Sequence, residues 1–167
     1  MSPDALVRPV QPDDLPQILD LHARVFGPGR FARAAYRVRE GTPPISRHCM
    51  KATLAGKLVA AIRFTPVSIG GRAGALLLGP LAVEPRYAGQ GYGKGLVAAG
   101  LEAAKADDVS LVVLVGDEPY YGRFGFTRVP LGQITFPGPV EPSRILAAEL
   151  EPATLTGFRG AVAAILD

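Results

Sequence analysis

Continuous apolar runs alternate along the chain with segments in which apolar residues recur every three or four positions. The runs predict buried strands, and the periodic segments predict amphipathic helices. The predicted strands are residues 5–10, 47–54, 58–65, 75–83, 110–115, 145–150 and 161–165, and residues 55–57 predict a hairpin turn between the second and third of them. The predicted helices are residues 15–26, 30–40 and 93–104, with a short helical turn at 120–121. This succession of strands and helices predicts an α/β fold.

The strand predicted over residues 75–83 is interrupted in its middle by Gly79 and Pro80. Pro80 has no N–H group and therefore cannot donate a hydrogen bond to a neighbouring strand. A break at this position would separate the second half of the strand from its neighbour and leave backbone amides free to bind another molecule. The residues concerned are Leu81, Ala82 and Val83.

Four glycines at alternate positions follow this strand and lead into the helical pattern of residues 93–104. They are Gly89, Gly91, Gly93 and Gly95. A glycine-rich loop before a helix can direct several unpaired N–H groups and the positive end of the helix dipole toward one point. This arrangement is typical of a phosphate or pyrophosphate site. Taken alone, the loop fits a tight strand-to-helix connection as well, and both interpretations stay open.

Two common phosphate-binding motifs do not fit the spacing. A Walker A loop requires Gly and Ser or Thr at positions that hold Ala88 and Gly95 here. A dinucleotide fingerprint requires Gly at positions that hold Lys94 or Leu96. The sequence therefore disfavours nucleotide hydrolysis and nicotinamide binding.

Length and composition predict a single domain over residues 1–167, because 48% of the residues are hydrophobic and 20% are charged. The net charge of +3 is too small to indicate nucleic-acid binding, although it would help to attract a polyanionic cofactor. Cys49 is the only cysteine, so no internal disulfide can form. The sequence shows neither a signal peptide nor an apolar run of the ~20 residues that span a membrane. We therefore expect a cytoplasmic protein without a membrane partner, and we predict no metal site.

The glycine loop resembles the coenzyme A signature of the GNAT superfamily of N-acetyltransferases, Gln/Arg-x-x-Gly-x-Gly/Ala, which follows a split strand. The matching segment runs from Ala88 to Gly93, with Ala88 in the place of the usual Arg or Gln. A second segment, which begins at Tyr121 and ends in Gly125-Phe126, resembles the family pattern Tyr-x-x-x-Gly-Phe. The two motifs stand in the family's order and at about its spacing.

This resemblance implies a GNAT-like fold, with a mixed central sheet that is split at a bulged strand and flanked by helices. It implies acetyl-CoA as the cosubstrate, held by the strand after the break and by the glycine loop. The residues that it assigns to cofactor binding are Leu81, Ala82, Val83, Gly89, Gln90, Gly91, Tyr92, Gly93 and Lys94.

The resemblance implies Tyr121 as the catalytic acid. A phenol with a pKa near ~10 can donate a proton to the thiolate that leaves during acetyl transfer. A backbone N–H near Ala82 can polarise the thioester carbonyl. The alternative for Tyr121 is an ordinary buried aromatic whose hydroxyl bonds a backbone carbonyl, with Tyr120 as the second candidate acid.

The general base is not identified by the sequence. Many family members have a glutamate on the central strand, but Leu76–Leu78 contain no carboxylate. Glu84 is a weak candidate, because it lies on the loop side of the strand. His22 falls on the apolar face of the first helix, where a packed core histidine and a catalytic base are the two interpretations. The amine can also lose its proton to water.

The predicted helix 30–40 carries arginines at 30, 33, 37 and 39, and Arg47 and Lys51 follow in the next strand. Arg30, Arg33 and Arg37 share one face, and they predict an acceptor with a carboxylate or phosphate if that face borders the acceptor groove. A solvated arginine face is the alternative.

The function predicted from these features is acetyl transfer from acetyl-CoA to a primary amine of a small molecule or peptide, by direct attack. A non-catalytic acyl-CoA-binding sensor is the alternative. Nucleic acid is not expected as a partner, and whether the chain forms a homodimer stays open.

Overall fold

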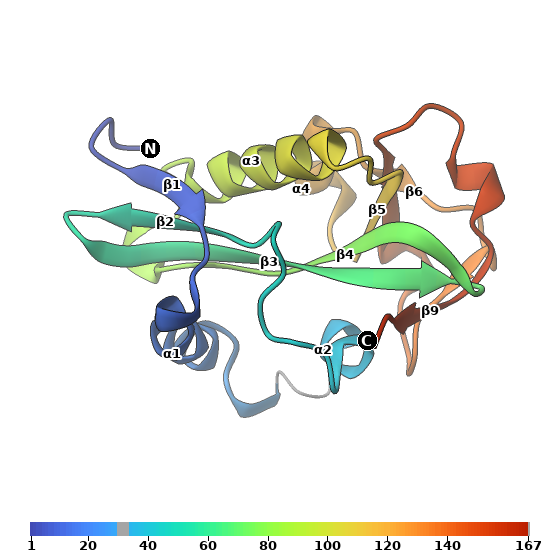
Figure 1. Ribbon diagram of the computed structural model, residues 1–167, viewed down its shortest axis with the longest axis horizontal. Helices are drawn as coiled ribbons and strands as arrows, with labels where there is room; N and C mark the ends of the chain where they lie inside the picture. Colours follow the sequence, from blue (N-terminus) through green and yellow to red (C-terminus); the bar gives the residue numbers. More distant parts are fainter. Residues whose placement is uncertain (30–33, 167) are drawn as a thin grey trace.

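The computed structural model describes residues 1–29 and 34–166 of the chain. A twisted sheet runs through the middle of the molecule, in the strand order β1-β2-β3-β4-β5-β8-β6 (Figure 1). Strand β9 pairs with β3 and with β7, and among the described pairs only β4–β5 and β7–β9 are parallel. The strands are β1 Leu6–Pro9, β2 Met50–Leu54, β3 Lys57–Ile69, β4 Arg72–Val83, β5 Leu111–Val115, β6 Thr127–Arg128, β7 Ile134–Thr135, β8 Ile145–Glu149 and β9 Gly160–Ala164.

Helices cover both faces of the sheet. Helices α1 (Leu15–Phe26) and α2 (Ala34–Arg39) lie on one face, and α3 (Tyr92–Ala106) and α4 (Glu118–Tyr121) lie on the other (Figure 1). The described part of the chain contains no helix with the length and hydropathy that a membrane crossing requires. Short 3₁₀ turns occur at Pro12–Asp14, Pro85–Tyr87, Gly122–Phe124, Pro142–Arg144 and Leu155–Gly157. The mixed sheet between helices confirms the predicted fold class.

The hairpin predicted at residues 55–57 is present between β2 and β3. Ala55 and Gly56 both have positive φ angles, 52° and 76°, as a tight hairpin turn requires. Strand β3 is longer than predicted and continues past Pro66 to Ile69. Pro66 is tolerated because the ladder with β2 ends at Ile62 and the ladder with β9 begins at Val67, so its missing N–H interrupts neither.

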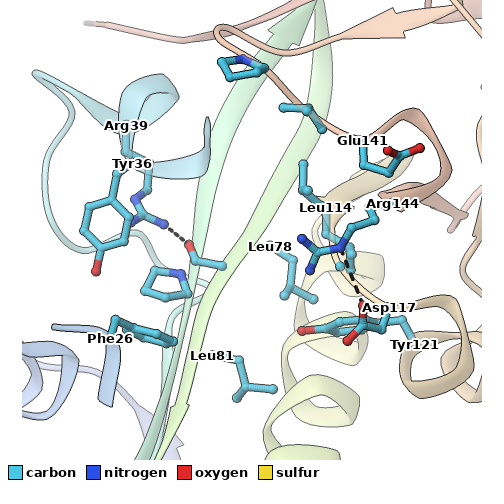
Figure 2. Close-up of a pocket in the computed structure, with 16 residues that line it drawn as sticks. Phe26, Tyr36, Arg39, Leu78, Leu81, Leu114, Asp117, Tyr121, Glu141 and Arg144 are labelled. Atoms are coloured by element: carbon cyan, nitrogen blue, oxygen red, sulfur yellow. Dashed lines mark hydrogen bonds and ion pairs between the residues drawn. The ribbon is translucent and has the colours of Figure 1, made fainter. Parts of the chain in front are cut away.

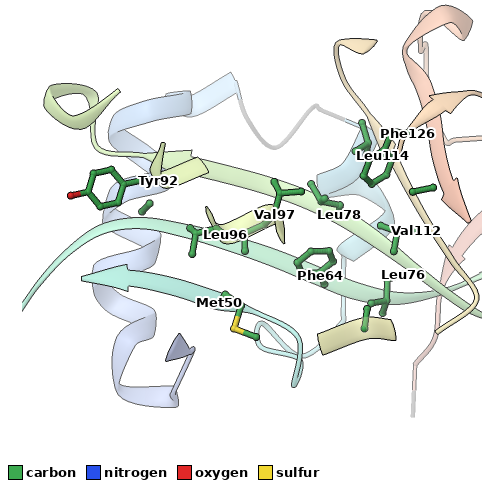
Figure 3. Close-up of a cluster of buried hydrophobic side chains, with 14 of the residues drawn as sticks. Met50, Phe64, Leu76, Leu78, Tyr92, Leu96, Val97, Val112, Leu114 and Phe126 are labelled. Carbon is green, nitrogen blue, oxygen red and sulfur yellow. The ribbon is translucent and has the colours of Figure 1, made fainter. Parts of the chain in front are cut away.

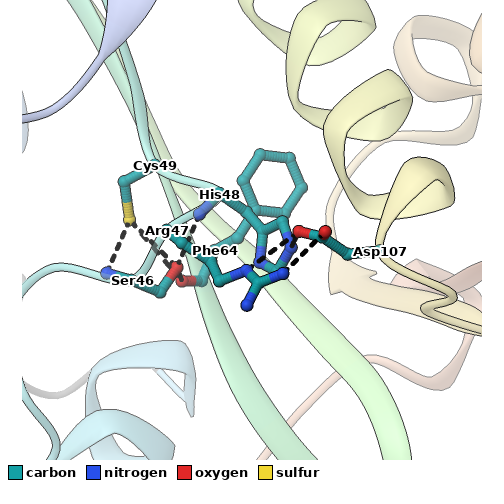
Figure 4. Close-up of polar contacts among 6 residues, drawn as sticks. All are labelled: Ser46, Arg47, His48, Cys49, Phe64 and Asp107. Atoms are coloured by element: carbon teal, nitrogen blue, oxygen red, sulfur yellow. Dashed lines mark hydrogen bonds and ion pairs between the residues drawn. The ribbon is translucent and has the colours of Figure 1, made fainter.

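Strand β2 begins at Met50 and not at residue 47, because residues 46–49 form a turn instead (Figure 4). The Cys49 amide donates to the Ser46 carbonyl at 3.2 Å, and the Ser46 hydroxyl donates to the Phe64 carbonyl at 2.6 Å. The side chains of Arg47 and His48 in this turn contact Asp107 at the end of α3. The Asp107 carboxylate lies 2.6 Å from Arg47 Nη2 and 2.8 Å from His48 Nε2. These bonds tie the start of β2 to the far end of α3.

The largest hydrophobic core lies between α3 and the sheet (Figure 3). Leu96 and Val97 of α3 are fully buried against Phe64 of β3, whose side chain is also fully buried. Gly100 makes this contact possible, because a Cβ atom there would lie 2.2 Å from Phe64 Cε2. The packing fixes α3, and therefore the glycine loop before it, against the sheet.

Gly100→Ala should lower the free energy of unfolding by about 1–3 kcal/mol, because the added methyl overpacks the core despite a better helix propensity. Gly95→Ala in the same helix is the matched control, since its methyl would meet only the flexible end of the Met1 side chain. Urea unfolding of both variants measures the difference. Equal stability of the two variants would show that α3 does not pack on Phe64 as described.

Candidate functional site

The sheet opens between its two central strands. Strand β4 pairs with β3 as far as Val83, with a register shift around Gly79 and Pro80, but its parallel ladder with β5 ends at Leu77. Gly79 has φ +133°, a conformation that L side chains rarely adopt. Beyond Leu77, the edge of β4 that faces β5 has no paired strand among the described residues. The predicted split is therefore present at the predicted position.

The glycine loop lies between the end of β4 and the start of α3. Gly89 and Gly91 have φ angles of +76° and +91°, and Gly91 is the N-cap residue of α3. No side chain caps this helix end, so the first N–H groups of α3 receive no acceptor from a capping residue. A helix of 15 residues thus presents its positive end at the loop.

The predicted cofactor-binding residues of the loop contribute in different ways. The Gln90 and Lys94 side chains are exposed, whereas Tyr92 is only 1% exposed and packs edge-on against Tyr87. Tyr92 can therefore offer a ligand its backbone but not its ring. Gly93 is required for packing, because a Cβ atom there would lie 2.6 Å from the Tyr120 hydroxyl.

Tyr121 is positioned by aromatic contacts on α4. Its ring packs edge-on against Phe126 and Tyr120, with centroid distances of 5.8 and 4.8 Å. Gly116 leaves room for the ring, because a Cβ atom there would lie 2.7 Å from Tyr121 Cε2. The Tyr121 hydroxyl has no hydrogen-bond partner among the described residues, which disfavours the bond to a backbone carbonyl as its role.

Burial raises the pKa of Tyr121 to about 12, and the negative charges that Tyr120 and Asp117 can carry add to this effect. The nearby Arg144 guanidinium opposes it. A phenol with a raised pKa keeps its proton throughout the neutral range. Tyr121 is therefore suited to donate a proton and not to accept one.

A cavity of about 390 Å³ lies where β4 and β5 separate (Figure 2). Leu78 and Leu81 line the cavity from β4, and Tyr121 lines it from α4. The Tyr121 hydroxyl is directed into the cavity. Of the predicted strand residues, Leu81 therefore faces the cavity, whereas Ala82 is buried. The remaining walls come from α1, α2, β5 with the two residues after it, and the segment before β8.

The described members of the predicted arginine cluster, Arg37, Arg47 and Lys51, do not line the cavity. Arg47 pairs with Asp107, and Lys51 Nζ lies 2.7 Å from a carboxylate oxygen of Asp14, both away from the cavity. Arg37 is exposed and does not line the cavity. Arg30 and Arg33 lie outside the described residues. A helical repeat shows which residues share a face, but it does not show which of them meets a cavity.

The two weak candidates for the base do not line the cavity. The Glu84 carboxylate forms an ion pair with Arg24 of α1 at 2.7 Å, which joins α1 to the end of β4. His22 is buried on α1, 6.0 Å from Phe26 between ring centroids, and lines a separate small cavity. Its burial agrees with the interpretation as a packed core histidine.

Several cavity residues were not identified from the sequence. The helical spacing only groups Arg39 with the other arginines of its helix, and no motif marks Asp117, Glu141 or Arg144. Glu141 and Arg144 belong to a segment rich in proline and glycine, which shows no local pattern. They reach the cavity only because β8 pairs with β5 and brings the preceding loop to the opening.

The comparisons with known proteins agree with this geometry. The sequence profile described as "Acetyltransferase (GNAT) domain" matches residues 6–129. The uncharacterised N-acetyltransferase YhbS of Escherichia coli K12 is 28% identical over 158 residues, 94% of each chain. YjhQ, another uncharacterised N-acetyltransferase of that strain, is 30% identical over 86% of this chain and 84% of its own length.

Solved structures show the same fold. The crystal structure of E. coli YhbS in complex with CoA superimposes with a TM-score of 0.81 and 30% identity, covering 99% of this chain and 93% of that one. A GNAT family acetyltransferase from Brucella melitensis, solved with acetyl-CoA, gives a TM-score of 0.61 and 27% identity, covering 86% of this chain and 94% of that one.

Proposed function

Because the chain belongs to the GNAT family of acetyltransferases, we propose that it transfers an acetyl group from acetyl-CoA to a primary amine. The observation that carries the proposal is the opening between β4 and β5, with a glycine loop beside it and Tyr121 inside it. The CoA and acetyl-CoA complexes of the two similar structures support the choice of cosubstrate.

The described residues fit an acyl-CoA molecule. The uncapped N–H groups at the start of α3 suit a pyrophosphate, and the positive φ angles at Gly89 and Gly91 let the backbone approach it closely. The free edge of β4 at residues 81–83 suits the amide groups of a pantetheine arm, which can pair with it as a strand would. Lys94 is exposed beside the loop and can meet a phosphate.

Acetyl-CoA supplies a thioester carbonyl that an amine can attack. A bond forms between the amine nitrogen and the carbonyl carbon, and the bond from that carbon to sulfur breaks. We assign two tasks to this chain: a backbone N–H of β4 near Ala82 polarises the carbonyl, and Tyr121 gives its proton to the departing sulfur. The raised pKa of Tyr121 means that this proton is present at neutral pH.

The amine must lose a proton, and two carboxylates line the cavity. Asp117 faces Arg144 at 3.5 Å, whereas Glu141 is exposed and accepts a bond from the Ser143 hydroxyl at 3.4 Å. Among the described residues, Glu141 has no cationic partner, so we propose that it receives the proton and passes it to solvent. This assignment replaces Glu84, which Arg24 holds elsewhere.

A non-catalytic acyl-CoA sensor is the competing function. A sensor needs the glycine loop but has no use for a half-buried phenol whose hydroxyl faces a cavity. The Tyr121 hydroxyl has no hydrogen-bond partner in the described part of the chain, and this favours catalysis. Release of free CoA from acetyl-CoA, measured with a panel of amines, tests the proposal; no amine-dependent release from the folded protein would favour the sensor.

Gly91→Val should raise the dissociation constant for CoA at least about tenfold, because valine cannot easily adopt the positive φ of this N-cap residue. Gly132→Val is the matched control: Gly132 has a similar φ of +79° and open space around it, but it lies outside the loop. Isothermal titration calorimetry compares the two variants. Undiminished CoA affinity in folded Gly91→Val would remove the phosphate site from the loop.

Tyr121→Phe should lower kcat by ~10²-fold or more and leave the dissociation constant for CoA nearly unchanged, because the ring remains and only the proton is lost. Tyr120→Phe is the control, and it should keep most of the activity. Steady-state kinetics with the best amine of the panel give the comparison. Equal turnover of wild type and Tyr121→Phe would leave Tyr121 with a packing role only.

A further inference from the structure

Arg39 is a buried cation in the cavity wall, and no described residue gives it an acidic partner. The residue is only 4% exposed, and its Nη1 group donates to the carbonyl oxygen of Gly79 at the break in β4 (Figure 2). Its Nε atom is buried and has no hydrogen-bond partner among the described residues. The guanidinium carbon lies 4.1 Å from the centre of the Tyr36 ring. These neighbours position the guanidinium but do not neutralise its charge.

A second arginine increases the positive charge at this place. Arg63 of β3 is half-buried, and its Nη2 donates to the Thr42 hydroxyl at 2.9 Å and to the Pro43 carbonyl at 3.1 Å, both neutral groups. Burial, and next the charge of Arg63, lower the pKa of Arg39 to about 10, so Arg39 still carries its charge at neutral pH. No salt bridge joins either arginine to a described carboxylate.

A buried charge is costly unless an opposite charge accompanies it. The other charged groups of the cavity do not supply that charge. Asp117 faces Arg144, and Glu141 is exposed on the wall across β4 from Arg39 (Figure 2). The counter-ion of Arg39 is therefore expected to be a ligand.

We propose that Arg39 binds a carboxylate of the acceptor, so that the acceptor class is amines that also carry a carboxylate, such as amino acids and short peptides. A guanidinium pairs with a carboxylate through charge-assisted hydrogen bonds, and Arg39 lines the cavity from α2. Arg39 and Tyr121 line the same cavity, so a molecule held by the guanidinium is enclosed with the proposed acid. The inference rests on the proposed acetyl transfer, because it names the acceptor of that reaction.

The test compares L-amino acids with their carboxamides, which keep the amine and lose the negative charge. For each amino acid that wild type acetylates, kcat/KM should be at least about tenfold higher with the free carboxylate than with the carboxamide. Arg39→Met keeps an apolar side chain in place. In this variant the ratio of kcat/KM for the carboxylate to kcat/KM for the carboxamide should fall to near one, because KM for the carboxylate rises. Arg37→Met is the matched control, since Arg37 is exposed on the same helix and should leave the ratio unchanged.

Binding without turnover provides an independent readout. N-acetyl amino acids and N-acetyl amino acid amides are titrated calorimetrically into the CoA complex of wild type and of both variants. Wild type and Arg37→Met should bind the carboxylates more tightly, and Arg39→Met should not. Arg39→Lys, which keeps the charge, should recover part of the preference for carboxylates over amides. It replaces Arg39→Met in the test if that variant does not fold.

The proposal is overturned if wild type uses or binds the carboxamides as well as the carboxylates, or if Arg39→Met retains the preference. Failure of the proposed function looks different. In that case no amine of the panel releases CoA, and the calorimetric titrations of wild type and Arg39→Met with carboxylates and carboxamides decide whether Arg39 holds a carboxylate.

Discussion

Strand β4 keeps its hydrogen bonds to β3 over almost its whole length but loses β5 after Leu77, and the rest of the site depends on this one divergence. Backbone groups in the interior of a sheet normally bond a neighbouring strand. Here the bulge at Gly79 and Pro80 turns them toward an open space instead. Because β3 continues to pair with β4, the opening lies within the sheet and is not a frayed edge.

Two sets of contacts make use of this opening from opposite faces of the sheet. On one face, Phe64 and Gly100 hold α3 so that its uncapped end lies beside the end of β4. On the other face, Arg39 of α2 bonds the Gly79 carbonyl, which the bulge exposes. The same break in the strand therefore serves the proposed cofactor side and the proposed acceptor side.

The sequence predicted the features that depend on local chemistry. The split at Gly79-Pro80, the glycine loop and the hairpin at Ala55-Gly56 are read from residue types, and the family follows from two motifs. The short strands β6 and β7 were missed, because two-residue strands have no periodicity. Arg39 and Glu141 were not singled out, since their positions depend on contacts with segments far away in the chain. The single domain and the cytoplasmic location stay predictions, and whether the chain forms a homodimer stays open.

Hydrogen–deuterium exchange with and without CoA tests the central claim most directly, because it reports on the backbone amides themselves. The account predicts slower exchange on CoA binding in peptides that cover residues 81–83 and 89–94, with no change in β8, which lies on the other side of β5. CoA binding, verified by calorimetry, that slows exchange only outside these two segments would contradict the claim that the opening of β4 and the glycine loop form the cofactor site.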